Sequence, residues 1–597
     1  MVVRTLPGLA RAVILLAGLC LSACSGGGGG SDSPAPVPSP PSQPSPSGDD
    51  VFEKEAETAR FLTQATFGPT AAEINSLTGS SASDWFRREV SKSPSHNLQY
   101  VLEYTMSDRG RTSNGVNVSY EGNQSPTFSF WVNAIEADDQ LRQRMAFALS
   151  EILVVSHIET VELFDEPVSV ADYQDILVDN AFGNFRELLE DVTYSPAMAE
   201  WLTYLRNKKA DEATGRMPDE NYAREVMQLF TIGLVELNQD GTERTDPSGE
   251  AIPTYSNEDV VGLARVFTGL SVANERFDKG FHEAPLASLY SRLQIWPEYH
   301  SQREKAFLGT VIPENTGAEE SIATALDTLY NHPNLPPFFS RQLIQRFITS
   351  DPTPAYVERV ADAFAAGTYT LPDGTSVGDG RRGSLEATIA AVLFDSEARS
   401  EAARNRSDFG KVREPVLRFA SWARAFNAGD IRPEDSPLLW NTGSAQALAQ
   451  APYKSPSVFN FYRPGYIAPG TESGAAGMTV PELQIVNASS TAGYTNFMSY
   501  FALAYPSDAR EPLEATSFIP DYLEERQLAG DPQALVDHLS LVLAYDSILP
   551  ATRTNIVEAI DEIPLTSQFD DEYDGELMRI GMATLMVMTS PEYLVQR

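Results

Sequence analysis

The sequence predicts a mainly α-helical fold, a large multi-helical globular domain that carries small β-hairpin insertions. Three observations lead to this prediction. Apolar residues recur at the spacing of a helix face in most segments after residue 51. Helix-start patterns, in which a hydroxyl residue precedes a proline or a carboxylate, separate these segments. Strand-like stretches with Asp-Gly turns are confined to residues 233–242 and 368–378.

The clearest helical segment is residues 138–156, "DDQLRQRMAFALSEILVVS". Its apolar side chains fall on one stripe, at Leu141, Met145, Ala148, Leu149, Ile152 and Val155. Residues 338–348 and 355–367 show the same spacing and are expected to be amphipathic helices. With 42% hydrophobic residues in 597, the chain can bury a sizeable core.

Several helix starts can be placed from capping patterns. Pro196 and Pro354 each follow a hydroxyl residue, the arrangement of an N-cap followed by proline at the first helical position. Ser256 is followed three residues later by Asp259, which is the pattern of a capping box. These signals predict helices that begin directly after residues 195, 256 and 353.

Residues 218–230, "PDENYAREVMQLF", place four charged residues near one helix start. Pro218 fits the first helical position, so the two acids after it fall in the first turn, where the helix dipole favours carboxylates. Glu220 and Arg224 have the spacing of a helical ion pair. Glu225 lies among apolar neighbours and needs a partner if it faces inward. The stretch is therefore either a well-formed helix start or part of a site.

Residues 1–23 are expected to be a lipoprotein signal peptide. Two arginines precede the apolar run at residues 12–21, which is shorter than the roughly 20 residues of a membrane-spanning helix. The run ends in "LSAC", which is similar to a bacterial lipobox and predicts acylation of Cys24. Residues 24–50 are a Gly/Ser-rich and then Pro/Ser-rich tether, which an ordinary cysteine at a plain cleavage site would leave unexplained.

The residue after the cysteine is Ser25, which by analogy with enteric lipoproteins predicts the outer membrane, facing the periplasm or the surface. Cys20 leaves with the signal peptide, so the mature chain keeps one cysteine and has neither a disulfide framework nor a cysteine-based metal site. Residues 51–597 then form the helical domain, with a subdivision expected near residues 505–530.

The chain is strongly acidic, with a formal net charge of −38. Loss of residues 1–23 removes two arginines and no acid, which makes the mature protein still more negative. Such a field repels nucleic acid and anionic lipid surfaces, so nucleic acid is not an expected partner. It attracts divalent cations, and a divalent cation is therefore the cofactor class to test, although the sequence does not identify a metal.

Eight stretches together resemble a known family. They are "FLTQATFGPT" (61–70), "LRQRMAFALSEILVVS" (141–156), "PDENYAREVMQLFTIGLVELN" (218–238), "YSNEDVVGLARVFTGL" (255–270), "YHSQREKAFLG" (299–309), "HPNLPPFFSRQLIQRFI" (332–348), "YKSPSVFNFYRPGY" (453–466) and "TSPEYLVQR" (589–597). Their order is that of the bacterial exported family called domain of unknown function 1800, and the resemblance runs from about residue 55 to the end. It implies export and, because many members are encoded beside a sulfatase-like protein, a partner of that kind. It implies no activity.

One departure from the family concerns residues 300–305, "HSQREK". Many members carry His-Asp-x-Gly-x-Lys there. His300 and Lys305 keep their spacing, whereas Ser301 stands in place of the aspartate. This puts in doubt any metal or acid–base role that needs that carboxylate.

Three classes of function remain open from the sequence. The first is an accessory protein, lipid-anchored in the cell envelope, that partners an exported sulfatase-like enzyme acting on polysaccharide. It rests on the lipobox, the tether and the lack of a complete catalytic set in the sequence. The second is a metal-dependent hydrolase, which requires a helix and a loop to converge in one cleft and uses Glu220, Glu225, His300 and Lys305.

The third class is a non-catalytic glycan-binding protein. The stretch "FNFYRPGY" brings aromatic rings beside a guanidinium, and such groups stack on sugar rings. The candidate residues are Tyr462, Arg463 and Tyr466. Core packing or a rigid Pro-Gly turn is the structural alternative for the same residues.

Overall fold

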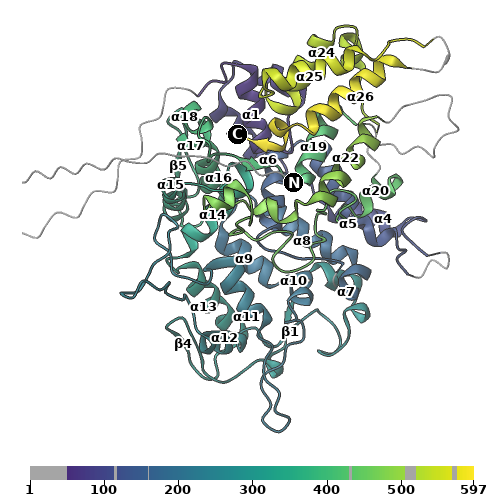
Figure 1. The fold of residues 1–597 in the computed structure, drawn as a ribbon. Helices are drawn as coiled ribbons and strands as arrows, with labels where there is room; N and C mark the ends of the chain where they lie inside the picture. Colours follow the sequence, from purple (N-terminus) through teal and green to yellow (C-terminus); the bar gives the residue numbers. More distant parts are fainter. Residues whose placement is uncertain (1–49, 113–116, 159, 429–432, 504–518, 568–573) are drawn as a thin grey trace, which may run out of the picture. The chain divides into compact units, whose positions relative to one another are not determined.

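The computed structural model describes residues 50–112, 117–158, 160–428, 433–503, 519–567 and 574–597. The described residues contain twenty-seven α-helices and four two-stranded antiparallel sheets (Figure 1), which confirms the mainly α-helical fold with small hairpins. Residues 46–597 form one compact unit. The signal peptide, Cys24 and nearly all of the tether lie outside the described residues, and so does part of the region near 505–530 where a subdivision is predicted.

The helices fall into three stretches of the chain. Before residue 202 they are α1 (Glu55–Ala65), α2 (Ala71–Leu77), α3 (Ala82–Ser91), α4 (Leu98–Met106), α5 (Ser125–Glu136), α6 (Gln140–Ser150), α7 (Val161–Asp165), α8 (Pro167–Asp179), α9 (Phe185–Thr193) and α10 (Pro196–Trp201). The second stretch holds α11 (Asn221–Glu225), α12 (Asn257–Ala264), α13 (Ala318–Tyr330), α14 (Leu335–Phe347), α15 (Pro354–Ala366), α16 (Leu385–Phe394), α17 (Ser396–Arg399), α18 (Glu401–Arg404) and α19 (Pro415–Ala425). The third holds α20 (Pro437–Trp440), α21 (Glu472–Ala475), α22 (Ala488–Ala502), α23 (Leu523–Leu528), α24 (Pro532–Ala544), α25 (Pro550–Asp561), α26 (Gly575–Met588) and α27 (Pro591–Leu594).

Each sheet pairs two very short strands. The pairs are β1 (Leu270–Ser271) with β2 (Gln294–Ile295), β3 (Lys305–Phe307) with β4 (Thr310–Ile312), β5 (Tyr369–Thr370) with β6 (Ser376–Val377), and β7 (Lys411–Val412) with β8 (Val595–Gln596). The predicted hairpin at residues 368–378 is β5–β6. The stretch at 233–242 instead supplies part of a longer, irregular hairpin of isolated pairs, in which Val235 lies opposite Pro253.

The predicted helix starts at residues 195, 256 and 353 are confirmed. Ser256 and Asp259 form a reciprocal capping box at the start of α12. Pro354 is the first residue of α15, and the hydroxyl of Thr353 accepts a hydrogen bond from the N–H of Tyr356. These caps satisfy main-chain donors that the first helical turn would otherwise leave unpaired.

Helix α6 is buried along its whole length, from Gln140 to Ser150. The prediction that a helix continues to residue 156 is wrong, because α6 ends at Ser150 and Glu151 is its C-cap. A guanidinium N–H of Arg346 donates to the main-chain oxygen of Glu151 at 2.9 Å, so a side chain from α14 satisfies this oxygen just past the helix end.

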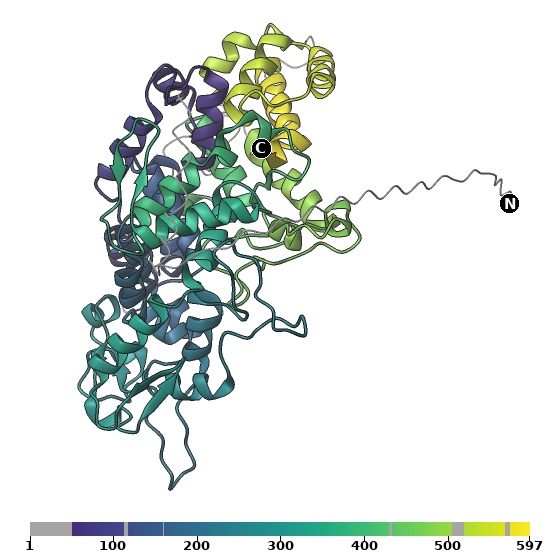
Figure 2. The ribbon, with the colours of Figure 1, turned by 90° about the vertical axis from the view of Figure 1, so that its left-hand side faces the viewer.

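The two ends of the described chain meet. Helix α1 packs against α24, and Nε of Arg60 donates to the main-chain oxygen of Arg597 at 2.6 Å. Strand β8, next to the C-terminus, pairs with β7. Figures 1 and 2 both show α1 beside the yellow C-terminal helices, with the C-terminus between them.

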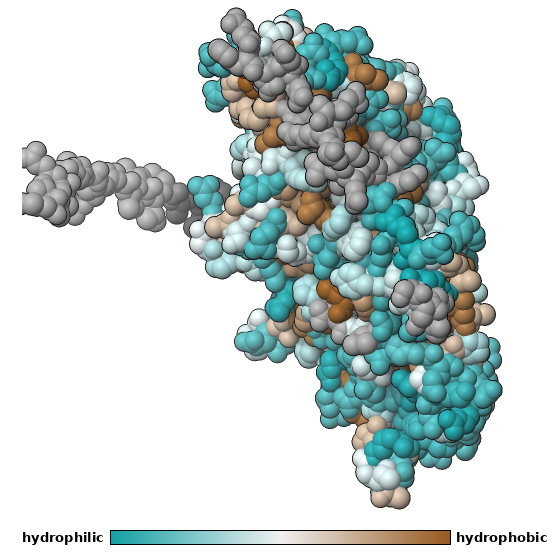
Figure 3. All heavy atoms as spheres, turned by 90° about the vertical axis from the view of Figure 1, so that its right-hand side faces the viewer, coloured by the Kyte–Doolittle hydropathy of each residue, from teal (hydrophilic) through white to brown (hydrophobic). Residues whose placement is uncertain are grey.

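The surface is mostly polar. Figure 3 shows hydrophilic residues over most of one face, with hydrophobic residues scattered among them. Among the described residues, no helix combines the length and the apolar character that crossing a bilayer requires.

Candidate functional site

The charged stretch at residues 218–230 begins its helix later than predicted. Helix α11 starts at Asn221 with Glu220 as its N-cap residue, so Pro218 is not at the first helical position. The reason is local: the side chain of Asn207 accepts a hydrogen bond from the main-chain N–H of Asp219 at 2.9 Å, which holds the preceding residues in a loop. The carboxylate of Asp219 in turn accepts from the N–H of Asn221 at 2.9 Å.

The predicted ion pair of this stretch is present, and Glu225 is buried. Arg224 and Glu220 lie 3.3 Å apart, and both side chains are partly exposed. Glu225 ends α11, immediately before a π-helical turn over Val226–Thr231. Its Oε2 is buried without a hydrogen-bond partner, and burial raises the pKa of this carboxyl. A π-helical turn often marks a functional position.

His300 and Lys305 are both fully buried and lie near each other. Nδ1 of His300 donates to the main-chain oxygen of Thr268 at 2.9 Å, while Nε2 has no partner. Burial lowers the pKa of His300 to about 4, and the positive charge of Lys305 adds to the effect. Nζ of Lys305 has no hydrogen-bond partner, and burial, followed by the charge of Arg265, lowers its pKa.

The structure brings two of the four predicted hydrolase residues together. Helix α12 packs against both α11, which carries Glu225, and β3, which begins at Lys305. Within the described residues no hydrogen bond or ion pair joins Glu225 to His300 or Lys305, and no group of three His, Cys, Asp or Glu side chains is placed to hold a metal. A metal role for the set of Glu220, Glu225, His300 and Lys305 stays a prediction.

The three residues predicted to bind glycan point in different directions. Tyr462 is 4% exposed, and its hydroxyl donates to Oε1 of Glu151 at 3.1 Å, so its ring is not a surface platform. Arg463 is exposed, with its guanidinium 4.8 Å from the ring centre of Phe459. Tyr466 is half-buried. Arg463 and Tyr466 are thus the members of this set that a ligand can reach from solvent.

The contact of Tyr462 leads to a pair of glutamates that the sequence did not single out. Glu151 follows α6, and Glu414 is the residue before α19. They are 5% and 0% exposed. Each changes the pKa of the other, and both accept a hydrogen bond from the amide of Gln450. We call Glu151 and Glu414 the carboxylate pair.

Neutral donors surround Oε1 of Glu151. It accepts hydrogen bonds from Asn460 Nδ2 at 3.0 Å, Tyr462 Oη at 3.1 Å and Gln450 Nε2 at 3.4 Å. Gln450 also donates to Oε2 of Glu414 at 2.9 Å. One amide therefore bridges the two carboxyl groups and fixes their relative orientation.

A buried lysine balances Glu414. Nζ of Lys411 lies 3.0 Å from Oε1 of Glu414 and 2.7 Å from Oε1 of Glu482, and all three side chains are at most 2% exposed. The hydroxyl of Ser350 donates to the other oxygen of Glu482 at 2.9 Å. Because each buried charge here has an opposite charge and a hydrogen bond, the arrangement avoids an uncompensated ion.

Oε2 of Glu151 accepts no hydrogen bond, and Oε1 of Glu414 has only its ion pair with Lys411. Nε of Arg346 is 3.7 Å from Oε2 of Glu151, which is beyond hydrogen-bond distance. A proton held between the two carboxyl groups explains the unpartnered oxygen of Glu151 and leaves one negative charge instead of two. The same sharing occurs where two carboxyls meet in aspartic proteases.

The two members of the pair have opposite pKa shifts. Burial, and then the negative charge of Glu414, raises the pKa of Glu151 to about 8. Burial also acts to raise the pKa of Glu414, but the charges of Lys411 and Arg144 outweigh it and hold this pKa well below its usual range. At neutral pH the shared proton therefore belongs to Glu151, and Glu414 is ionised.

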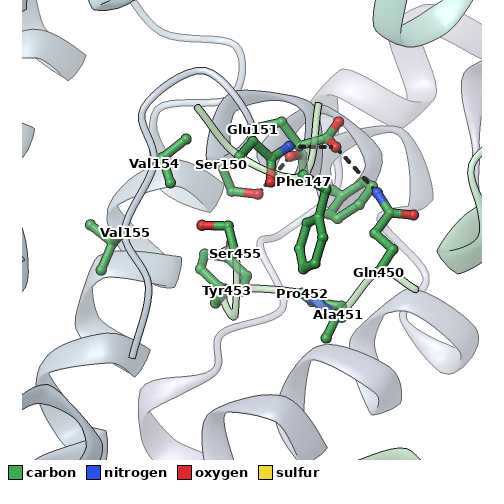
Figure 4. A pocket seen from close by; sticks show the side chains of 12 residues that line it. Phe147, Ser150, Glu151, Val154, Val155, Gln450, Ala451, Pro452, Tyr453 and Ser455 are labelled. Carbon is green, nitrogen blue, oxygen red and sulfur yellow. Dashed lines mark hydrogen bonds between the residues drawn. The ribbon is translucent and has the colours of Figure 1, made fainter. Parts of the chain in front are cut away.

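A small pocket opens beside Glu151 (Figure 4). Its volume is about 10 Å³, close to the space that one water molecule needs. The close-up shows the amide of Gln450 directed at the carboxyl of Glu151, with Phe147, Tyr453 and Ser455 along the wall. A water or hydroxyl group in this pocket would meet a carboxyl that can release or accept one proton near neutral pH.

A larger cavity, of about 350 Å³, lies elsewhere and is polar. Its charged lining residues include Glu73, Lys92 and Arg424. Arg424 pairs with Glu73 at 3.0 Å, and Lys92 pairs with Glu89. Each of these three charged residues therefore has an ion-pair partner, and the cavity lining contains no residue of the predicted sets.

The carboxylate pair was missed because its members are far apart in the sequence. One signal was available: Glu151 interrupts the apolar run "AFALSEILVV", where a charge needs a buried partner. The stretches that carried the family resemblance supply Glu151, Arg346, Asn460 and Tyr462 to one cluster. No single stretch indicates that these four residues lie together.

Comparison with known proteins gives one finding. A family model described as "Protein of unknown function (DUF1800)" matches residues 60–595. No curated protein and no solved structure gives a significant match.

Proposed function

This chain belongs to the family described as Protein of unknown function (DUF1800), and we propose that it is an exported, lipid-anchored protein of the cell envelope with an acid–base hydrolytic site at the carboxylate pair. The observation that carries the catalytic part is the meeting of Glu151 and Glu414 beside a pocket with room for one water. Hydrolysis was one of the functions that the sequence left open, although with different residues.

The pair has the properties of a general acid–base. A catalytic carboxyl works best when its pKa is near the working pH, and the pKa of Glu151 is raised to about 8. Glu151 lines the pocket, and the negative charge of the neighbouring ionised Glu414 helps to keep the proton on Glu151 until it is transferred. Gln450, Asn460 and Tyr462 keep the carboxyl in place, so little reorganisation accompanies the transfer.

The catalytic test uses three matched variants of the full chain. Glu151→Gln keeps the shape of the side chain and removes its proton transfer, and Glu414→Gln keeps the shape and removes the charge that raises the pKa of Glu151. Glu525→Gln is the control, because Glu525 is equally buried but pairs with His538 at 2.8 Å, away from the carboxylate pair. The assay is a panel of chromogenic esters, amides and glycosides.

The expected result is a loss of kcat by about 100-fold or more in both pair variants and an unchanged rate in the control. The kcat of the wild type should also fall as the pH rises above about 8, where Glu151 loses its proton. Activity in the pair variants within twofold of the wild type would overturn the catalytic assignment. So would a wild type that turns over no member of the panel.

The export and anchor part rests on the signal-like residues 1–23 and on Cys24. Expressed in a bacterium, the wild type should fractionate with membranes and partition into detergent. Cys24→Ser should be released into the soluble fraction. Equal membrane retention of the two proteins would contradict the lipid anchor at Cys24.

A second candidate function is the accessory role beside an exported sulfatase-like enzyme acting on polysaccharide. The specific observation in its favour is the small size of the Glu151 pocket, whose 10 Å³ cannot hold a sugar ring. On this proposal the carboxylate pair only stabilises the core. Cross-linking in membranes of the native host, followed by purification of the tagged protein, should recover the partner, and recovery of no exported enzyme would remove the support for this role.

A further inference from the structure

Two buried side chains near the end of α12 each have a nitrogen atom without a hydrogen-bond partner. Nζ of Lys305 and Nε2 of His300 are both unpartnered, and both residues are 0% exposed. Buried polar atoms are rarely left without a hydrogen bond, and a buried ammonium without an acceptor is especially costly. These two atoms therefore need an explanation that the proposed acid–base site does not give.

The charges that act on these two groups are all positive. Lys305 and Lys209 lower the pKa of His300, and Arg265 lowers the pKa of Lys305, in each case after the effect of burial. No carboxylate of the described residues is among the groups that shift either pKa. A bridging water would satisfy hydrogen bonds but would leave this concentration of positive charge uncompensated.

The backbone holds His300 in a fixed orientation. The main chain of Gly269, at φ 81°, lies so close that a Cβ there would come within 2.9 Å of the main-chain nitrogen of His300. Nδ1 is occupied by the carbonyl of Thr268, at 2.9 Å. Only Nε2 is therefore available, and once protonated it is a second donor beside the ammonium of Lys305.

We propose that Lys305 and His300, supported by the charges of Lys209 and Arg265, form a binding site for a small oxyanion such as sulfate, phosphate or a carboxylate. The anion accepts hydrogen bonds from Nζ of Lys305 and from Nε2 of protonated His300. Residues 302–304, which connect the two donors in the sequence, are exposed to solvent. Binding of the anion is accompanied by uptake of a proton on His300.

The test measures the thermal unfolding of the full chain in chloride buffer with added sulfate, phosphate or formate. Lys305→Met removes the ammonium and keeps the length of the side chain. Lys54→Met is the control, because Lys54 lies on the surface with 72% of its side chain exposed. The variants are essential because sulfate and phosphate stabilise most proteins without binding to a site.

The wild type and Lys54→Met should gain at least about 2 °C more in Tm from one of the three anions than Lys305→Met gains. In chloride alone, Lys305→Met should unfold at the same temperature as the wild type or higher, since it removes an uncompensated buried charge. An equal response of all three proteins to every anion would overturn the proposal. The anion that gives the largest difference identifies whether sulfate, phosphate or a carboxylate is bound.

A second measurement keeps the proposal testable if Lys305→Met folds poorly. The pKa of His300 can be followed by NMR in protein labelled at histidine, with His300→Asn to assign the signal. In chloride it should titrate near pH 4, and the bound anion should raise its pKa by at least about one unit. A pKa that does not change with any of the anions would contradict the site.

Discussion

Gly262 of α12 lies against the main-chain oxygen of Ala306 in β3, so closely that a Cβ on Gly262 would come within 1.7 Å of that oxygen. The helix and the strand that begins at Lys305 are therefore packed backbone to backbone. The position of Lys305 depends on this contact, and only glycine at position 262 leaves room for it.

Gly262→Ala is expected to destabilise the protein by about 2 kcal/mol or more, although alanine favours helices over glycine by about 1 kcal/mol. The clash is with backbone, which cannot rotate away. Gly530→Ala is the control, since no heavy atom lies within 4 Å of the added Cβ there. Urea unfolding measures both, and a Gly262→Ala variant as stable as the control would contradict the close packing.

Glu151→Gln should change how stability depends on pH. The pKa of Glu151 is raised from 4.5 to about 8 in the folded protein, so the folded state holds the proton more tightly than the unfolded state. Stability from this group is full below about pH 4.5 and is lost as the pH rises to about 8. As the pH rises from 5 to 8.5, the free energy of unfolding of Glu151→Gln should increase by on the order of 3 kcal/mol relative to that of the wild type.

Urea unfolding at pH 5, 6.5 and 8.5 checks this, with Glu525→Gln as the matched control. A constant difference between Glu151→Gln and the wild type over this range would show that Glu151 does not hold a proton at neutral pH.

His300 should have the opposite effect at acidic pH. Its pKa is lowered from 6.5 to about 4, so the unfolded state binds the proton more tightly. Stability from this group is present above about pH 6.5 and is lost as the pH falls to about 4. In chloride buffer the free energy of unfolding of the wild type should fall by about 2–3 kcal/mol over this range, and that of His300→Asn should not show this fall.

His96 provides a contrast for the same measurement. Its ring pairs with Asp179 at 2.8 Å and its pKa is raised, so His96→Asn should lose stability mainly at low pH. If the stability of His300→Asn varies with pH as that of the wild type does, His300 is not held neutral.

Asn334→Ala should be one of the more destabilising polar substitutions. The buried side chain donates to the carbonyls of Ile232 and Val235, at 2.8 and 2.7 Å, and accepts from the N–H of Leu237 at 2.9 Å. Alanine leaves these main-chain groups unpaired, at an expected cost of about 2–4 kcal/mol.

The control for this substitution is Asn331→Ala, which removes one exposed hydrogen bond to Asp327. Thermal unfolding should place it close to the wild type. A similar, small loss in both variants would show that water replaces the contacts of Asn334.

Local signals in the sequence predicted local structure. The helix starts at Pro196, Ser256 and Thr353 and the hairpin around Asp373 depend on residues close in the chain, and the structure confirms them. The start at Pro218 was wrong because Asn207, outside the stretch, holds the preceding loop.

The carboxylate pair depends on long-range packing, which has no periodic signal. Nothing near Glu151 indicates that Glu414 or Tyr462 will meet it. The pairing of β7 with β8 could not be predicted either. Strands of two residues show no alternation of apolar and polar side chains, and these two are separated by most of the C-terminal half of the chain. For His300 and Lys305, the spacing in sequence was enough to suggest their proximity, but not the lack of a negative partner.

The junction of the two chain ends has a mechanical consequence for a force that pulls on the N-terminal end of the described chain. Such a force first meets Asp50 and Val51, which are bonded to residues 81–83, and then α1. There Arg60 is bound both to Arg597 and to the main-chain oxygen of Ala398, at 2.9 Å, and β8 is paired with β7. The load is thus shared by the last residues and the middle of the chain, so the fold is expected to resist unfolding from its N-terminal end.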